Sequence, residues 1–180
     1  MKCVDLPAKL FLNDFQGNYK VYIDAVFAVF KRDFIKQKAY FGFYVLGLQY
    51  HPCFQDRAYT FYHMTHKGEV ESERVPDLRC CECMPWVRPT VEQTVNDKLR
   101  FWEQERSNRP RVCIWLEVED DYFVILDVRK IFVLLWTAFV AEHSHEVRKK
   151  QKEYEAWCKA VGNRSYTPDE LVGEIMERLP

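Results

Sequence analysis

Residues 111–140 read RVCIWLEVEDDYFVILDVRKIFVLLWTAFV and decide the fold class of this chain. The stretch divides into three apolar runs, at residues 111–117, 122–127 and 131–140. Only short charged breaks separate these runs, and breaks of that length are typical of turns between consecutive antiparallel strands. With one more strand expected over residues 99–105, the pattern predicts an antiparallel meander of about four strands.

Helical patterns flank the meander on both sides. Over residues 18–35, aromatic and β-branched side chains recur at spacings of three and four, which predicts a helix with one buried face. The charged segment 142–160 predicts a surface helix that lies on the sheet or extends away from it. Thr167-Pro168-Asp169-Glu170 is a capping-box start and predicts a final helix that ends near Leu179.

The segment between the first helix and the meander is harder to interpret. Residues 40–50 are aromatic and β-branched and predict a strand that ends at His51-Pro52, because proline cannot donate a ladder hydrogen bond. Residues 58–65 alternate well enough to predict a second strand paired with it. Residues 76–93 mix cysteines, charges and prolines, so short helical turns are expected there.

These predictions define an α+β protein. We expect N-terminal helices, then a small antiparallel meander, with the C-terminal helices packed on or beside the sheet. The expected division is a core domain over residues 1–141 and a helical extension over residues 142–180.

Composition restricts the function and the location. The 180 residues carry 26 Lys and Arg against 27 Asp and Glu, which argues against a generic basic coat for nucleic acid. A content of 48% hydrophobic residues excludes a mostly disordered chain. The N-terminus has no pattern of a signal peptide and no apolar run is long enough to span a membrane, so we expect no membrane partner and a cytoplasmic protein whose 7 cysteines are reduced.

Imidazoles and cations gather in residues 49–89, a pattern that suits an anionic ligand carrying phosphate. The charged and imidazole residues of this region are His51, His63, His66, Lys67, Arg74, Asp77, Arg79 and Arg88. The sequence has no Gly-rich phosphate loop with its lysine, no GxGxxG and no HExxH. We therefore expect no nucleotide cofactor and no bound metal.

Several short motifs occur in an ordered series along the chain. The motifs are His51-Pro52, Phe61-Tyr62-His63-Met64-Thr65, Arg74-Val75-Pro76-Asp77-Leu78-Arg79, Pro85-Trp86-Val87-Arg88-Pro89, Trp115-Leu116, Asp121-Tyr122-Phe123-Val124-Ile125-Leu126 and Leu135-Trp136-Thr137-Ala138-Phe139. Over residues 15–155 this series resembles small prokaryotic and phage-associated proteins that are similar to the metal-independent RNase superfamily of barnase, EndoU, the colicin tRNases and RelE-type toxins. The resemblance implies N-terminal helices followed by an antiparallel sheet.

The resemblance also implies a reaction. A toxin-like endoribonuclease of this superfamily attacks a phosphate with the adjacent RNA 2′-OH and leaves a 2′,3′-cyclic phosphate and a 5′-OH, without metal or cofactor. His63 is then the expected general base or acid, Arg79 and Arg88 hold the phosphate, and Thr137 orients the substrate. His51, Lys67 and Arg74 are the expected substrate-binding residues.

Other interpretations stay open at this point. Cys80 and Cys83 stand where the similar proteins are richer in arginine, which favours a catalytically inactive member that binds RNA, an antitoxin or another protein, with the helix 142–160 as the contact. The CxxC of Cys80 and Cys83, completed by Cys53 or His51, favours a small zinc-stabilised regulatory protein. By base rate, His63 is a hydrogen-bonded histidine and the arginines form surface ion pairs.

Overall fold

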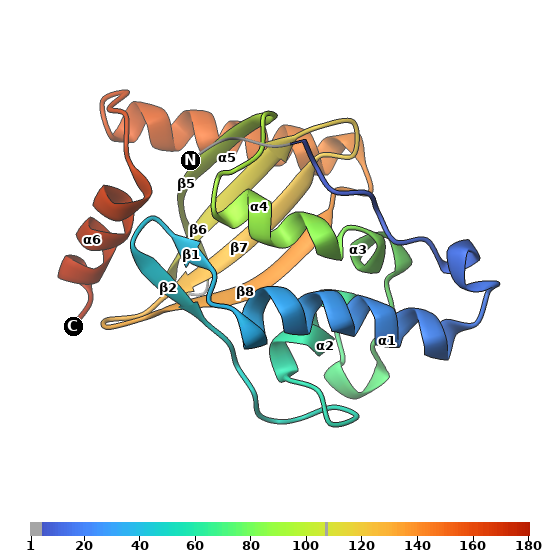
Figure 1. The fold of residues 1–180 in the computed structure, drawn as a ribbon. Helices are drawn as coiled ribbons and strands as arrows, with labels where there is room; N and C mark the ends of the chain where they lie inside the picture. Colours follow the sequence, from blue (N-terminus) through green and yellow to red (C-terminus); the bar gives the residue numbers. More distant parts are fainter. Residues whose placement is uncertain (1–4, 107) are drawn as a thin grey trace.

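The structure is a computed structural model that describes residues 5–106 and 108–180. Its centre is a six-stranded sheet in the order β1-β2-β8-β7-β6-β5 (Figure 1). Four of these strands are consecutive and antiparallel: β5 (Lys98–Arg106), β6 (Arg109–Glu117), β7 (Tyr122–Val128) and β8 (Val133–Val140). The four predicted meander strands are therefore confirmed, with bounds within two residues of the prediction.

The complete sheet is larger than expected and is not purely antiparallel. The segment expected as one strand over residues 40–50 forms a hairpin of β1 (Tyr40–Phe41) and β2 (Tyr44–Gly47), because the chain turns at Gly42 with a φ of +60°. Strand β2 then pairs in parallel with β8, where Leu46 lies beside Val133. The result is a mixed sheet that curls into a half-barrel, so the predicted small antiparallel meander is wrong for the sheet as a whole.

The strand predicted over residues 58–65 is also wrong, because this segment is a helix, α2 (Tyr59–Thr65). It packs beside β8, and its buried side chains point in several directions: Thr60, Phe61, Tyr62, Met64 and Thr65. A short apolar run that is buried on most sides carries neither a clear period of two nor of 3.6. A small ladder, β3 (His66–Lys67) with β4 (Val75–Pro76), follows the helix.

The other helices agree with the sequence. The N-terminal helix is α1 (Tyr19–Phe30), capped by Asn18 and extended by a π-helical turn, η2 (Lys31–Lys36). The expected helical turns are α3 (Leu78–Glu82), η4 (Met84–Trp86) and α4 (Val87–Val91). The C-terminal helices are α5 (Ser144–Ala160) and α6 (Pro168–Arg178). Two short 3₁₀ turns, η1 (Leu12–Phe15) and η3 (Glu71–Glu73), complete the described elements.

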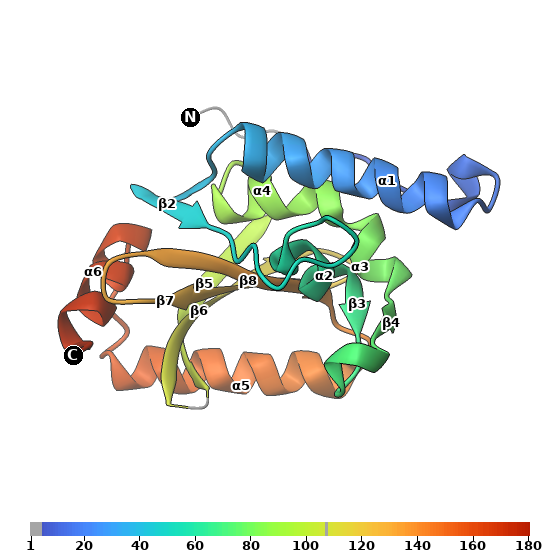
Figure 2. The same ribbon diagram turned by 90° about the horizontal axis from the view of Figure 1, so that it is seen from below.

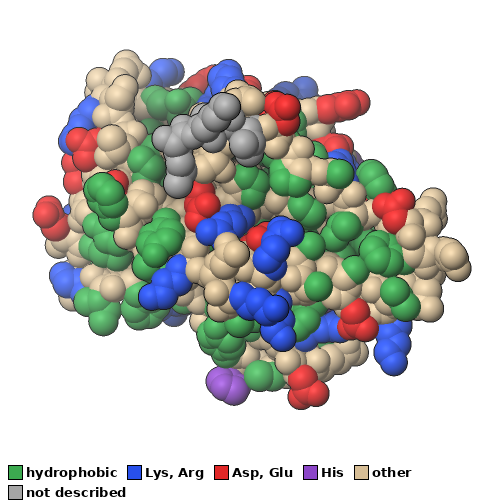
Figure 3. Space-filling model, viewed as in Figure 1, with side chains coloured by type: hydrophobic (Ala, Val, Ile, Leu, Met, Phe, Trp, Pro, Cys, Tyr) green, Lys and Arg blue, Asp and Glu red, His purple; other side chains and the backbone are tan. Residues whose placement is uncertain are grey.

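The helices form two layers with the sheet between them (Figure 2). Helices α1, α3 and α4 cover one face, and α5 crosses the opposite face, toward which the β5–β6 hairpin bends (Figure 2). Figure 3 shows the first of these faces, where basic side chains lie among hydrophobic ones. No helix in the described part of the chain is long and apolar enough to cross a membrane.

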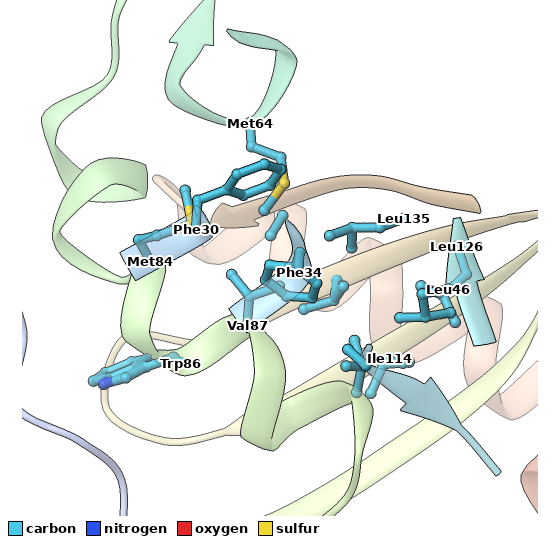
Figure 4. Packing of buried hydrophobic residues seen from close by; sticks show 14 of the residues in the cluster. Phe30, Phe34, Leu46, Met64, Met84, Trp86, Val87, Ile114, Leu126 and Leu135 are labelled. Carbon is cyan, nitrogen blue, oxygen red and sulfur yellow. The ribbon is translucent and has the colours of Figure 1, made fainter. Parts of the chain in front are cut away.

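Two hydrophobic clusters lie on the two faces of the sheet. The larger one joins α1, α2 and η4 to the strands, and Figure 4 shows Phe30, Met64, Met84 and Leu135 meeting in it. Helix α6 adds Leu171, Val172 and Ile175 to the same cluster. The smaller cluster, on the α5 side, contains Trp102, Cys113, Trp115, Phe123 and Ile125. The boundary at residue 141 between a core and an extension stays a prediction.

Candidate functional site

A groove runs between the sheet and α5. One part of it is a cavity of about 320 Å³ lined by His63, Gln104, Arg106, Arg111, Ile125, Trp136, Thr137, Phe139 and Lys150. A second cavity, of about 520 Å³, shares Gln104, Arg106, Phe139 and Lys150 with the first and continues along α5 to His145 and Lys149. We call the two cavities together the sheet–α5 groove.

Strand alternation brings these side chains to one face. Successive side chains of a strand point to opposite sides of the sheet, so residues two apart share a face. Gln104 pairs with Arg111 across β5 and β6, and Ile125 pairs with Thr137 across β7 and β8. A β-bulge between Ile125 and Leu126 leaves Trp136 without a partner in the β7–β8 register, next to the groove.

His63 enters the groove from α2, whose Phe61 and Met64 belong to the cluster on the other face. The centroid of its ring lies 5.0 Å from the ring of Trp136 and 5.8 Å from the ring of Tyr59. Burial, and then the positive charges of Arg74 and Arg111, lower the pKa of His63 to about 4. The imidazole is therefore neutral at pH 7, and the lowered pKa makes it a weaker proton acceptor than a free imidazole.

Two guanidiniums of the groove form no ion pair in the described part of the chain. The side chain of Arg111 lies 5.0 Å over the ring of Trp136, and its Nε is buried without a hydrogen-bond partner within residues 5–106 and 108–180. Neither Arg111 nor the exposed Arg106 forms an ion pair with any described residue. Lys150, in contrast, pairs with Glu153 at 3.1 Å. The groove thus offers two guanidiniums without an ion pair to an anion, in a lining that also contains the carboxylates of Glu105, Glu146 and Glu153.

The neighbouring buried carboxylate is only half paired. Asp127 is fully buried and stands opposite Arg111 in the register of β6 and β7; its Oδ2 pairs with Arg129 at 2.7 Å, whereas its Oδ1 is buried without a hydrogen-bond partner among the described residues. Burial lowers the pKa of Arg111, and the charge of Asp127 acts in the opposite direction. An anion bound at Arg111 would relieve this desolvation cost, since a buried charge is expensive until it is paired.

The structure brings together only two of the four predicted catalytic residues. His63 and Thr137 line the same cavity. Arg79 does not line the groove, and its exposed side chain lies 3.6 Å from Asp120. Arg88 does not line it either.

Arg88 has a structural role, because its guanidinium joins α4 to η2 and to the segment that follows η2. It donates hydrogen bonds to Glu92 at 3.2 Å, Gln37 at 2.7 Å and the backbone carbonyls of Asp33 and Lys38. A guanidinium with these partners is not available to a phosphate.

The three predicted substrate-binding residues lie outside the groove as well. Lys67 pairs with Glu142 and with Asp77. Arg74 donates to the carbonyl of Gly68 at 3.2 Å and lines a separate small cavity of about 180 Å³. His51 is exposed in a loop, where its Nδ1 lies 3.5 Å from Cys53 Sγ.

Sequence reasoning missed Arg106, Arg111, Lys150 and Trp136. Alternation gave no signal for Arg106, because residues 103–106 are all polar, and only the register with β6 places Gln104 beside Arg111. Lys150 belongs to the basic run of residues 148–152, and a run of this kind is typical of a solvated helix face or of a contact to an RNA backbone.

The cysteines give no support to a zinc site. In the described part of the chain, no group of three or more His, Cys, Asp or Glu side chains is arranged to hold a metal. Burial raises the pKa of Cys81 and Cys83 to about 12, and Cys80 shifts in the same direction. Without a bound metal, these thiols are therefore protonated at neutral pH.

A scan against models of protein families, a search of curated proteins and a search of solved structures each find no match to this chain.

Proposed function

We propose that the sheet–α5 groove binds the phosphodiester backbone of RNA. The observation that carries this proposal is the half-buried guanidinium of Arg111, which has an unpartnered Nε and no ion pair among the described residues. A planar guanidinium donates two parallel hydrogen bonds to phosphate oxygens, and Arg106 adds a second positive charge. The rings of Trp136 and Phe139 in the same lining provide surfaces on which bases stack.

We further propose that bound RNA is cleaved without a metal ion, as expected for a toxin-like endoribonuclease. His63 takes the proton of a ribose 2′-OH, and the 2′ oxygen forms a bond to phosphorus. The bond between phosphorus and the 5′ oxygen breaks, that oxygen takes a proton from water, and the hydroxide left behind takes the proton from His63, which is then neutral again. Arg106 and Arg111 stabilise the negative charge that builds up on the phosphoryl oxygens, and the products are a 2′,3′-cyclic phosphate and a 5′-OH.

The second candidate is a catalytically inactive protein that binds RNA or a protein partner such as an antitoxin. Two observations favour it over cleavage: Nδ1 of His63 is buried, and Arg79 and Arg88 are held away from the groove. In both proposals the protein acts in the cytoplasm.

One experiment tests binding and cleavage together. Purified protein is incubated in EDTA with a labelled single-stranded RNA at low salt, and both complex formation and the ends of any products are measured. We expect Arg111→Ala to weaken binding and His63→Gln to abolish cleavage while binding is kept. Lys20→Ala, on exposed α1 at the opposite face, is the matched control.

The outcomes separate the two candidates. If the unaltered protein binds the RNA but no product with a cyclic-phosphate end appears, cleavage is contradicted and the inactive binding role is supported. No binding at low salt would contradict both proposals for the groove.

A further inference from the structure

Five exposed apolar side chains gather at one end of the six-stranded sheet. They come from the β1–β2 hairpin and from the turn that joins β7 to β8, and we call them the hairpin patch: Tyr40, Phe43, Val45, Ile131 and Phe132. Phe43 is 88% exposed and Ile131 is 83% exposed. Figure 1 and Figure 2 show both turns on the side of the molecule that carries α6 and the C-terminus.

The register of the sheet makes the hairpin patch continuous. Tyr40 pairs with Val45 across the hairpin. Strands β2 and β8 are parallel, and the buried Leu46 lies beside the buried Val133. Val45 and Phe132 each stand one position earlier, so they are neighbours on the opposite, exposed side of the sheet. The exposed apolar surface therefore continues from β1 to the start of β8.

The hairpin patch is large for a chain that stays alone in solution. With side chains of ordinary size, the exposed parts of its five residues sum to roughly 600 Å², the upper end of what the largest apolar patch of a monomer covers. A protein–protein interface of standard size buries about 800 Å² on each partner. The patch therefore supplies most of the surface that one side of such an interface needs.

Charges of opposite sign stand at the two ends of the hairpin patch. Asp169, in the first turn of α6, accepts a hydrogen bond from the backbone N–H of Phe43 at 2.6 Å. Lys130, next to Ile131, donates to the backbone carbonyl of Leu179 after the end of α6, at 2.6 Å. The 11 residues of α6 span about 16 Å, so these two charges lie far apart. Neither side chain has an ion-pair partner among residues 5–106 and 108–180.

We propose that the hairpin patch is the interface between two copies of this chain related by a twofold axis. In such an interface the same surface of both copies meets in reversed orientation. The reversal brings Asp169 of each copy toward Lys130 of the other, so the apolar contact is flanked by two ion pairs. This self-complementarity favours a second copy over other occupants. None of the patch residues lines the sheet–α5 groove, so the dimer does not depend on RNA binding.

Sedimentation equilibrium of the full-length protein tests the dimer. The mass should rise from 21.7 kDa toward twice that value between about 1 and 200 µM, with a dissociation constant on the order of 10 µM. Ile131→Asp should raise this constant at least about tenfold, because it places a charge in the centre of the contact. Val21→Asp is the matched control, since Val21 is 50% exposed near the start of α1, and this end of α1 lies far from α6 (Figure 1).

A mixture of two charge variants tests the twofold arrangement. In Lys130→Glu alone, both flanking contacts join two negative charges, and in Asp169→Lys alone, both join two positive charges. Each variant should therefore dimerise several-fold more weakly than the unaltered protein. An equimolar mixture of the two should recover dimers, because every contact between the two different chains then joins opposite charges. Circular dichroism of each variant checks that α6 is kept.

Several outcomes would overturn the inference. A chain that stays monomeric up to about 200 µM contradicts it, and monomers that sediment with vesicles of phosphatidylcholine and phosphatidylglycerol would assign the patch to a lipid surface instead. A dimer that Ile131→Asp does not weaken uses another surface. If both charge variants fold and weaken the dimer but their mixture recovers none, the twofold pairing is wrong. If Asp169→Lys does not fold, the comparison of Ile131→Asp with Val21→Asp decides.

Discussion

The two faces of the sheet are covered in different ways. Helix α1 has 12 residues and buries four of its side chains against the sheet: Tyr22, Ile23, Val26 and Phe30. Helix α5 has 17 residues, and none of its own side chains is fully buried. Beneath α1 the strands contribute apolar side chains to one large cluster. Beneath α5 the cluster is small, and polar strand residues such as Gln104 and Arg111 line an open groove beside it.

The two faces of the sheet therefore contribute to different properties, one to the stability of the fold and the other to ligand binding. A face that is closely packed with hydrocarbon gains free energy from burial and leaves no space for a ligand. A face covered by an amphipathic helix with half-buried contacts can keep charged side chains in a groove that water and ligands reach. The α1 face should therefore govern the stability of the fold, and the α5 face should govern what the protein binds.

The largest expected effect is on the α1 face. Phe30→Ala removes a fully buried ring that contacts Phe27, Phe34 and Phe61, so we expect a loss of about 3–5 kcal/mol in the free energy of unfolding. Urea denaturation at a protein concentration that keeps the chain monomeric measures this loss. The matched control is Phe43→Ala, whose side chain is 88% exposed and whose effect should stay within about 0.5 kcal/mol. Similar losses for the two variants would mean that the aromatic cluster of α1 does not support the fold.

The next effect comes from His63, the titratable group that α2 places in the groove. Its pKa is about 4 in the folded protein and about 6.5 in an unfolded chain, so the unfolded state binds more protons between these pH values. The stability contributed by the neutral imidazole is complete above pH 6.5 and is lost as the pH falls toward 4. We expect a loss on the order of 2 kcal/mol between pH 7.5 and 4.5.

His63→Gln isolates this contribution, because glutamine does not titrate. Unfolding free energies of the two proteins are measured by urea denaturation at both pH values. The variant should lose less stability than the unaltered protein on acidification. An equal loss in both proteins would show that His63 is as accessible to protons when folded as when unfolded, which would remove the neutral base from the proposed mechanism.

A smaller effect is expected from the contacts of α5. Val147 is half-buried against the small cluster, and Val147→Ala removes its two partly buried methyl groups. The expected loss in the free energy of unfolding is about 1 kcal/mol. A loss as large as that of Phe30→Ala would contradict the view that α5 covers its face loosely.

Much of the fold could be predicted from the sequence because its periodicity is local. The strands over residues 98–140 have apolar runs with charged breaks, and Thr167 begins α6 with the capping box that its sequence predicts. Residues 58–65 could not be assigned from their periodicity, because seven residues buried on several sides fit a strand as well as a helix. The parallel pairing of β2 with β8 joins residues far apart in sequence, so no local pattern indicates it.

The site was harder to predict than the fold for a related reason. His63 was chosen for its chemistry, and the structure places it beside Thr137. Arg79 and Arg88 were predicted from the motifs that carry the resemblance, whereas the cations near His63 in space come from β5, β6 and α5. Arg111 is 48 positions away from His63 in the chain, since 111 − 63 = 48, and reaches it only through the sheet register and the position of α2.

The smallest expected effect distinguishes the arginines predicted from the sequence, such as Arg79, from the arginines that line the groove, such as Arg106. If Arg106 contacts a phosphate of single-stranded RNA, then Arg106→Ala should reduce the slope of log K against log salt concentration by about 0.7. Over a fourfold range of salt this is a difference of roughly threefold in affinity. Arg79→Ala should leave the slope unchanged, because Arg79 lies outside the groove near Asp120. Binding isotherms at several salt concentrations measure both slopes. A reduced slope for Arg79→Ala with an unchanged slope for Arg106→Ala would move the RNA contact from the α5 face to the side of the molecule where Arg79 lies.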